Sequence, residues 1–200
     1  MKKLIFYFVF VIILIFTMPI IFTNQFKAEE VASNQMEEEN FDYGKYSKIK
    51  LSHTETGQVE ELDLDQYLQG VVASEMPASF EIEALKAQAV VARTYTVYQI
   101  KNGKKHENSD MCDSSLCCQA WISKENRYTR WEKGKEDEYW NKILRAISET
   151  IGKFILYNGE PINALFHSNS GGATELAINV WGGNFPYFQV VETAGEENYT

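Results

Sequence analysis

Glu75 is an acidic residue at a position where helical periodicity predicts burial. The residues that precede it at helical spacing are all apolar: Leu64, Tyr67, Leu68, Val71 and Val72. Glu75 extends this stripe toward the core. Met76-Pro77 follow it directly and should end the helix. The sequence therefore predicts a carboxyl group on the apolar face of a helix, at the C-terminal end of that helix.

Such a position has a chemical consequence. Desolvation on an apolar face and the negative end of the helix dipole would both raise the pKa of Glu75. A carboxylic acid that keeps its proton near neutral pH can protonate a leaving group in glycosidic or acyl chemistry. Spacing alone leaves two alternatives open: the side chain turns outward at a frayed helix end, or it pairs with a buried base.

Two cations, Lys86 and Arg93, interrupt the otherwise uncharged stretch between Glu83 and Lys101. They are seven residues apart and therefore share one face of a helix. This arrangement indicates either that they converge on an anion, such as Glu75 or a substrate carboxylate, or that they face water. A cation close to Glu75 would favour its ionised form and oppose the raised pKa, and the sequence leaves both possibilities open.

The three cysteines, Cys112, Cys117 and Cys118, lie within seven residues, and His106 lies six residues before Cys112. Three nitrogen or sulfur ligands in one loop can hold Zn²⁺ and leave a fourth position for water or another group. A disulfide is an alternative, and it would use Cys112 because two adjacent cysteines form a strained pair. Free thiols are the third possibility. A thiol oxidoreductase is disfavoured, because the chain has no Cys-x-x-Cys motif.

Helices and hairpins are predicted to position these residues. The predicted helices cover residues 64–74 with Asp63 as the N-cap, roughly 80–100 with Ser79 as the cap, and about 135–151 with Gly152 as the stop. Two hairpins are expected, one within residues 48–64 and one within 153–167 around Asn158-Gly159. Helices grouped before and between hairpins indicate an α+β fold.

The N-terminal part of the chain differs from the rest. Residues 1–23 hold two lysines and then twenty uncharged residues, Leu4 to Thr23, about the length that crosses a bilayer as a helix. The run ends in bulky residues and not in a small-x-small site, so we expect an uncleaved single-pass anchor with a cytoplasmic N-terminus. Residues 24–46 are acidic and lack apolar periodicity, which is typical of a tether. Residues 47–200 are expected to form a globular domain that is truncated on its C-terminal side.

Composition limits the partners. Forty-four per cent of the 200 residues are hydrophobic, enough to fill one core. Apart from Lys2 and Lys3, 17 basic residues stand against 28 acidic ones, a net charge of −11. A surface of this sign disfavours nucleic acid as a partner.

Four blocks of the sequence carry a family resemblance, and they span about Leu62 to Thr193. They read "QYLQGVVASEMPASFEIEALKAQAVVARTYTVYQI", "DSSLCCQAW", "AISETIGKFILYNGEPINALFHSNSGGATELA" and "VWGGNFPYFQVVET". In this order they resemble the stage II sporulation protein D (SpoIID) family, peptidoglycan lytic transglycosylases of spore-forming bacteria. The resemblance implies an α+β fold around a glycan-binding cleft.

The resemblance also implies roles for individual residues. Glu75 would be the catalytic acid/base. The other residues with implied roles form two groups, one that binds substrate and one that binds zinc. The substrate-binding group is Lys86, Arg93, Gln119, His167, Ser170 and Tyr187. The zinc ligands, as in some family members, are His106, Cys112 and Cys118. Cys117 departs from the family pattern. We expect this zinc to order the loop near the cleft and not to activate the attacking group.

The expected activity is cleavage of MurNAc–GlcNAc bonds in peptidoglycan stripped of its stem peptides. The muramic 6-hydroxyl would close on the anomeric carbon to give a 1,6-anhydro end, so one carboxyl group suffices. The resemblance places the catalytic domain outside the cytoplasm at the sporulation septum, with a cell-wall amidase and other sporulation membrane proteins as partners. Because related proteins are described as amidase enhancers, a non-catalytic glycan-binding protein that recruits an amidase is the alternative.

Overall fold

The computed structural model describes residues 41–103, 105–183 and 185–196, which belong to one compact unit, Phe41–Thr200. Its helical elements are η1 (Gly44–Tyr46), α2 (Leu64–Glu75), α3 (Ile82–Asn102), α4 (Lys124–Tyr128), α5 (Glu136–Ser148) and α6 (Ala177–Trp181). Its strands are β1 (Lys48–Ser52), β2 (Val59–Asp63), β3 (Met111–Cys112), β4 (Leu156–Tyr157) and β5 (Glu160–Pro161). Helices and small sheets occur together, which confirms the predicted α+β class.

The predicted anchor (1–23) and most of the predicted tether (24–46) lie outside the described residues. Among the residues that are described, no helix has both the length and the apolar character needed to cross a bilayer. The domain boundaries and the anchor therefore stay predictions.

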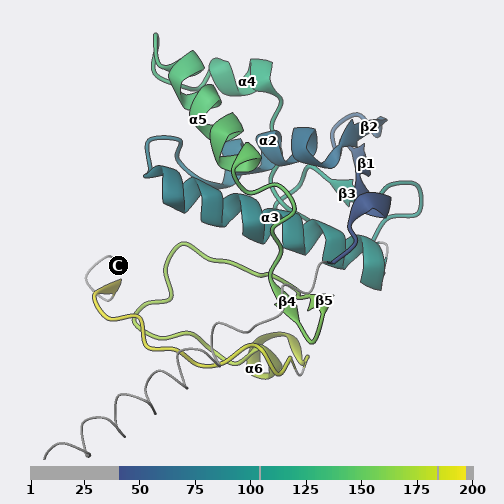
Figure 1. Ribbon diagram of the computed structural model, residues 1–200, viewed down its shortest axis with the longest axis vertical. Helices are drawn as coiled ribbons and strands as arrows, with labels where there is room; N and C mark the ends of the chain where they lie inside the picture. Colours follow the sequence, from purple (N-terminus) through teal and green to yellow (C-terminus); the bar gives the residue numbers. More distant parts are fainter. Residues whose placement is uncertain (1–40, 104, 184, 197–200) are drawn as a thin grey trace, which may run out of the picture. The chain divides into compact units, whose positions relative to one another are not determined.

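The first sheet has the strand order β2-β1-β3 (Figure 1). β1 and β2 form the predicted antiparallel hairpin, with Lys48 opposite Asp63 and Ser52 opposite Val59. The period-2 side-chain alternation places Ile49 and Leu51 in the core with no exposed surface. β3 pairs with β1 in parallel and was not predicted, because two residues are too short for a periodic pattern.

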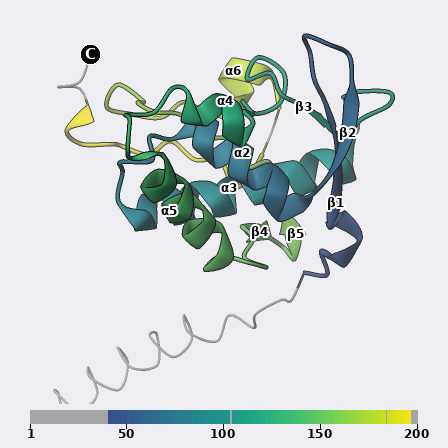
Figure 2. The same ribbon diagram turned by 90° about the horizontal axis from the view of Figure 1, so that it is seen from above.

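Helices α2, α3 and α5 pack on one another and enclose most of the core (Figures 1 and 2). The helix starts differ from those predicted. Asp63 is the N-cap residue of α2, but its side chain makes no cap hydrogen bond and instead pairs with Lys48 at 2.8 Å. Ser79 does not cap α3, which begins only at Ile82, because the chain first makes a turn in which the amide of Phe80 donates to the carbonyl of Pro77.

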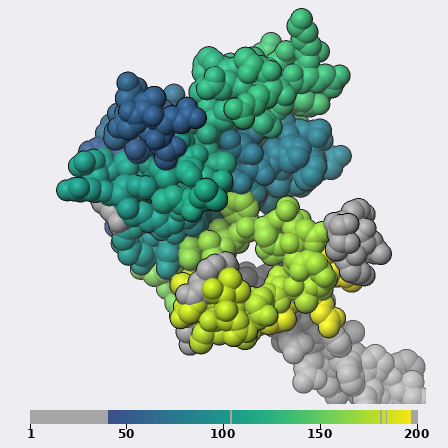
Figure 3. Space-filling model, turned by 180° about the vertical axis from the view of Figure 1, so that it is seen from behind, coloured from purple at the N-terminus to yellow at the C-terminus, as the bar shows by residue number. Residues whose placement is uncertain are grey.

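The chain after α5 has little regular structure. The hairpin of β4 and β5 turns at Asn158 (φ 52°) and Gly159 (φ 75°), and two successive positive φ values confirm the predicted type I′ turn. Beyond β5 the chain, yellow-green in Figure 3, runs mainly as loops with the short helix α6. Hydrogen bonds tie this segment to the rest, for example from Gln99 of α3 to the Asn163 side chain.

Candidate functional site

Glu75 is the last residue of α2, and its side chain is half-buried. The apolar stripe before it is in the core, with Val71 and Val72 fully buried, as the periodicity predicted. The chain leaves the helix at Met76, which is extended ahead of Pro77. Glu75 Oε1 accepts a hydrogen bond of 2.7 Å from the backbone amide of Ala120. One carboxylate oxygen is therefore fixed by the protein at the edge of the core.

The Ala120 amide is held in place by the packing of the next two residues against α2. The indole of Trp121 lies against Gly70, where a Cβ atom would overlap Nε1 and lie 2.6 Å from two ring carbons. The amide of Ile122 donates to the carbonyl of Gly70 at 3.4 Å. A side chain at position 70 would separate the loop from the helix, so the glycine permits the contact that positions Glu75.

The structure places Lys86 beside two other acids. Its Nζ is 2.8 Å from Glu83 Oε1 and 2.5 Å from Glu149 Oε2. Lys86 and Arg145 together lower the pKa of Glu149 to about 2 by hydrogen bonding to its carboxylate. In the described part of the chain no ion pair joins Lys86 to Glu75, so the alternative in which Lys86 pairs with that acid is not observed.

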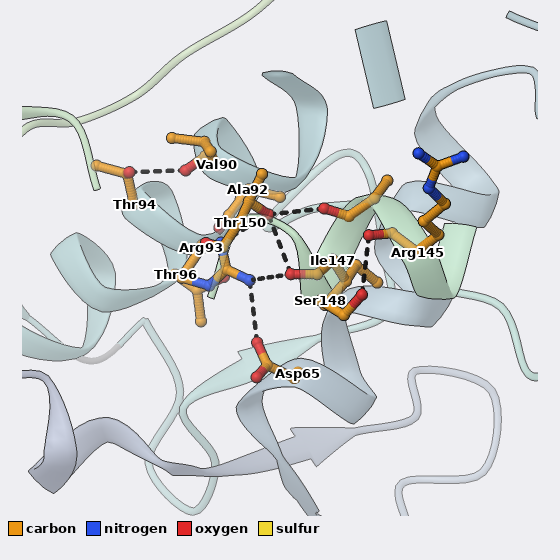
Figure 4. Close-up of polar contacts among 11 residues, drawn as sticks. Asp65, Val90, Ala92, Arg93, Thr94, Thr96, Arg145, Ile147, Ser148 and Thr150 are labelled. Atoms are coloured by element: carbon orange, nitrogen blue, oxygen red, sulfur yellow. Dashed lines mark hydrogen bonds and ion pairs between the residues drawn. The ribbon is translucent and has the colours of Figure 1, made fainter. Parts of the chain in front are cut away.

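Arg93 is an interior residue with 1% of its side chain exposed. Figure 4 shows its guanidinium between the start of α2 and the end of α5. It donates to the carbonyl oxygens of Thr150 (2.8 Å) and Ile147 (3.4 Å) and to the carboxylate of Asp65 (3.0 Å). Arg93 thus joins two helices through the core, and its predicted contact with a glycan stays a prediction that these partners do not support.

Gln119 is also buried and makes contacts within the protein. Its amide nitrogen donates to Thr96 Oγ1 at 3.0 Å and to the carbonyl of Ala92 at 3.5 Å. Gln119 therefore attaches the loop between the cysteines and Ala120 to α3. This arrangement is a supporting role, and glycan binding by Gln119 stays a prediction.

The three other predicted glycan-binding residues lie in the segment after β5. His167 is exposed, and the Tyr187 hydroxyl accepts a hydrogen bond from the Asn163 amide at 3.1 Å. Ser170 donates through both its amide and its hydroxyl to the carboxylate of Glu196, at 2.7 and 2.5 Å, which lowers the pKa of Glu196. None of the hydrogen bonds among the described residues brings these three side chains to Glu75, so their role is untested.

The predicted metal ligands come together, and Cys117 joins them. The ligand atoms of His106, Cys112, Cys117 and Cys118 all lie within 4.8 Å of one another. Histidine nitrogen and cysteine sulfur form the donor set that Zn²⁺ prefers. The cluster could therefore hold a metal ion, although its chemistry alone does not name the metal. Burial raises the pKa of the Cys118 thiol to about 12, so metal binding, which needs the thiolate, would release a proton.

This cluster is adjacent to the Glu75 contact in the chain. β3 fixes Cys112 beside β1, and the amide of Cys112 approaches Cys118 Sγ at 3.4 Å. Two residues after Cys118 comes Ala120, which donates to Glu75. Along the chain, only Gln119 therefore separates the cluster from the residue whose amide contacts Glu75.

Sequence reasoning missed the residues that fix Glu75 and Arg93 in place. Gly70 carried one signal, since an isolated glycine within a helical pattern can mark a close approach. Ala120 carried none, because it acts through its backbone amide. Asp65 carried none either, because an acid in the first turn of a helix is common without a buried partner.

Comparison with known proteins agrees with the sequence resemblance. Residues 52–157 match the family described as SpoIID, stage II sporulation protein. This chain belongs to the SpoIID family. It is 38% identical over 147 residues to stage II sporulation protein D of Bacillus subtilis (strain 168), covering 72% of this chain and 43% of that protein. It is 35% identical to the protein of the same name in Bacillus amyloliquefaciens, covering 72% of this chain and 42% of that protein.

A more distant SpoIID relative is named amidase enhancer, also from Bacillus subtilis (strain 168). The identity is 33% over 120 residues, which cover 60% of this chain and 14% of that protein. The chain thus spans less than half the length of the two sporulation proteins and a small part of the amidase enhancer. The family match includes Glu75, Ala120 and the four residues of the His/Cys cluster.

Proposed function

We propose that this SpoIID protein is a membrane-anchored lytic transglycosylase that cleaves MurNAc–GlcNAc bonds in peptidoglycan stripped of its stem peptides. The observation that carries the proposal is the position of Glu75. Its carboxyl group is half-buried at the end of an apolar helix, and the Ala120 amide holds one of its oxygens. A carboxyl group in fixed orientation is what general acid–base catalysis requires.

The proton transfers follow from this geometry. Because Ala120 donates to Oε1, the proton of the neutral acid resides on Oε2, which gives it to the glycosidic oxygen as the bond to the anomeric carbon breaks. The 6-hydroxyl of the same MurNAc then attacks that carbon, and the Glu75 carboxylate removes the hydroxyl proton. The products are a 1,6-anhydroMurNAc end and a free GlcNAc hydroxyl, with no water consumed.

A single carboxyl group agrees with the surroundings of Glu75. Glycosidases that use water or a covalent intermediate need two carboxyl groups, which are about 5–5.5 Å apart in retaining enzymes. Of the four acids near Glu75 in sequence, three are each paired with a cation: Asp63 with Lys48, Asp65 with Arg93 and Glu83 with Lys86. The fourth, Glu81, is the N-cap residue of α3. These pairs favour a mechanism in which the substrate supplies its own nucleophile.

We further propose zinc as the metal of the His/Cys cluster, with His106, Cys112 and Cys118 among its ligands. Bound there, the ion would supply cross-linking of the loop and no reaction step. The loop residues themselves position the acid, since Ala120 donates to Glu75 and Gln119 attaches the loop to α3.

The proposed location is the outer side of the cell membrane at the sporulation septum, reached through the single-pass anchor of residues 1–23. The proposed partners are a cell-wall amidase, which would remove stem peptides before cleavage, and other sporulation membrane proteins. The named amidase enhancer among the relatives supports an alternative, in which the protein binds glycan and stimulates an amidase without cutting.

The test compares the purified full chain in detergent with its Glu75→Gln variant on denuded glycan strands. Mass spectrometry should find 1,6-anhydroMurNAc ends with the wild type and none with Glu75→Gln. Glu83→Gln is the matched control, because Glu83 is largely exposed, and it should keep activity. If neither wild type nor Glu83→Gln yields anhydro ends while both bind the strands, the enzymatic proposal is wrong and the glycan-binding alternative is favoured.

A further inference from the structure

Cys117 is the member of the His/Cys cluster to which the family resemblance gives no role. We propose that Cys117 is the fourth protein ligand of the metal, so that the site is a closed Cys₃His centre with no position for water. This inference rests on the metal site proposed above and is independent of glycan cleavage.

The distances within the cluster fit a tetrahedral ion with Cys117 included. Zn–S bonds of about 2.3 Å and Zn–N bonds of about 2.0–2.1 Å imply tetrahedral edges of about 3.8 Å between sulfurs and about 3.5 Å between sulfur and nitrogen. His106 Nε2 lies 3.4 Å from Cys118 Sγ and 3.5 Å from Cys117 Sγ. The two sulfurs are 3.9 Å apart. Three of the four corners therefore already have the spacing of a metal site, and two of these corners are Cys117 and Cys118.

The local backbone explains how two adjacent cysteines can serve one ion. The amides of Cys117 and Cys118 both donate to the carbonyl of Ser114, at 3.2 and 2.8 Å. This tight turn curls the chain, so the two Sγ atoms face His106 together although neighbouring side chains in an extended chain would point apart. Cys112, held in β3, supplies the fourth ligand atom within 4.8 Å of the others.

A cation lies where the additional thiolate would place negative charge. Three thiolates and one neutral imidazole around Zn²⁺ leave a net charge of −1. Lys105 Nζ donates to the carbonyl of Cys117 at 2.6 Å and to the hydroxyl of Tyr95 at 3.0 Å. The ammonium group is thus fixed beside Cys117, and its charge offsets that of a Cys₃His centre.

A closed site determines what the metal does. Catalytic zinc sites keep one position for water or substrate, whereas structural sites use four protein ligands. With Cys117 as a ligand, the site would have no open position from which to polarise the glycan or generate hydroxide. A bound ion would cross-link the segment from His106 to Cys118, which continues into the amide that holds Glu75.

The first test uses the unmodified full chain in detergent, purified anaerobically with zinc. We expect one zinc per chain and slow reaction of all three thiols with dithiobis(nitrobenzoate), although Cys117 and Cys118 are only half-buried. A chelator should release the zinc and the three thiols together. One thiol that reacts fast while zinc stays bound overturns the proposal, as does a zinc-free protein whose mass shows a disulfide.

The second test uses Co²⁺ in place of zinc, because thiolate-to-cobalt absorption grows with the number of bound thiolates. Cys117→Ser should lose about a third of this absorption and bind Zn²⁺ more weakly, by about 10–100-fold or more, since even outer-shell changes cost that much. Leu116→Ser is the matched control at a residue that is 99% exposed, and it should equal the wild type. If Cys117→Ser, confirmed as folded by circular dichroism, matches Leu116→Ser in both measurements, Cys117 is not a ligand.

Discussion

Replacing Gly70 by alanine should have two opposing effects on the free energy of unfolding. Alanine is more favourable than glycine inside a helix by about 0.8–1.0 kcal/mol, which would stabilise α2. However, the new Cβ would overlap Nε1 of Trp121 and lie 2.6 Å from Cδ1 and Cε2. The indole must therefore shift, and overpacking of this kind costs about 1–3 kcal/mol. We expect the clash to exceed the propensity gain, with a net destabilisation of up to about 2 kcal/mol.

The same displacement should affect catalysis. Ala120 adjoins Trp121, so a shift of the indole moves the amide that donates to Glu75. Loss of an ordinary hydrogen bond is worth about 0.5–1.5 kcal/mol, which corresponds to a rate decrease of roughly 2–10-fold. Gly70→Ala should therefore reduce kcat for anhydroMurNAc formation, although position 70 does not touch the substrate.

Urea unfolding and product formation measure the two effects separately. Gln69→Ala, on the same helix, is the control for helix propensity and should leave activity unchanged. In a Trp121→Leu background, which removes the indole, Gly70→Ala should stabilise the protein by about 1 kcal/mol. A Gly70→Ala protein that is more stable than wild type and equally active would show that the Trp121 contact does not position Glu75.

Three further outcomes follow from the buried and charged groups. Arg93→Met should lower the free energy of unfolding by about 3 kcal/mol, because carbonyls such as that of Thr150 lose a charged donor in the core. Asp65→Asn should lower the free energy of unfolding by less, since Asp65 is 43% exposed. Urea titration of both variants checks the order. The lowered pKa of Glu149 means that its ion pairs stabilise the fold above about pH 4.5 and are lost as the pH falls toward about 2. The free energy of unfolding of Glu149→Gln should therefore depend less on pH than that of wild type over that range. An unchanged pH dependence would contradict the pairing of Lys86 with Glu149. Removal of zinc by a chelator should lower both the melting temperature and the cleavage rate, and added zinc should restore both; scanning calorimetry beside product analysis would detect a loss of one without the other.

Much of the fold follows from periodicity in the sequence. The stripe that ends at Glu75 predicted α2 and the burial of its face, and Asn158-Gly159 predicted the turn between β4 and β5. Element ends were less predictable, because α3 begins where a turn at Pro77–Phe80 finishes and not at the nearest capping residue.

The site was only partly predictable, for reasons that differ from residue to residue. The seven-residue spacing of Lys86 and Arg93 fixes a common helix face. In the folded protein, however, Lys86 pairs with acids at the surface, whereas Arg93 is buried in the core. The spacing of the cysteines could not assign Cys117, because a tight turn at Ser114 decides the direction of its side chain. The donor to Glu75 is a backbone amide. Every residue except proline has one, so the residue type at position 120 could not predict this contact.

The interior position of Arg93 has a consequence for how the chain reaches its native state. Its partners come from Asp65 at one end and from Ile147 and Thr150 at the other, so the guanidinium is satisfied only after all three helices have assembled. Before α5 has packed, the guanidinium between α2 and α3 is paired only with Asp65 and lacks its two carbonyl acceptors, which opposes the packing of these two helices. The helical part should therefore fold and unfold as one cooperative unit, with uniformly slow amide hydrogen exchange across α2, α3 and α5.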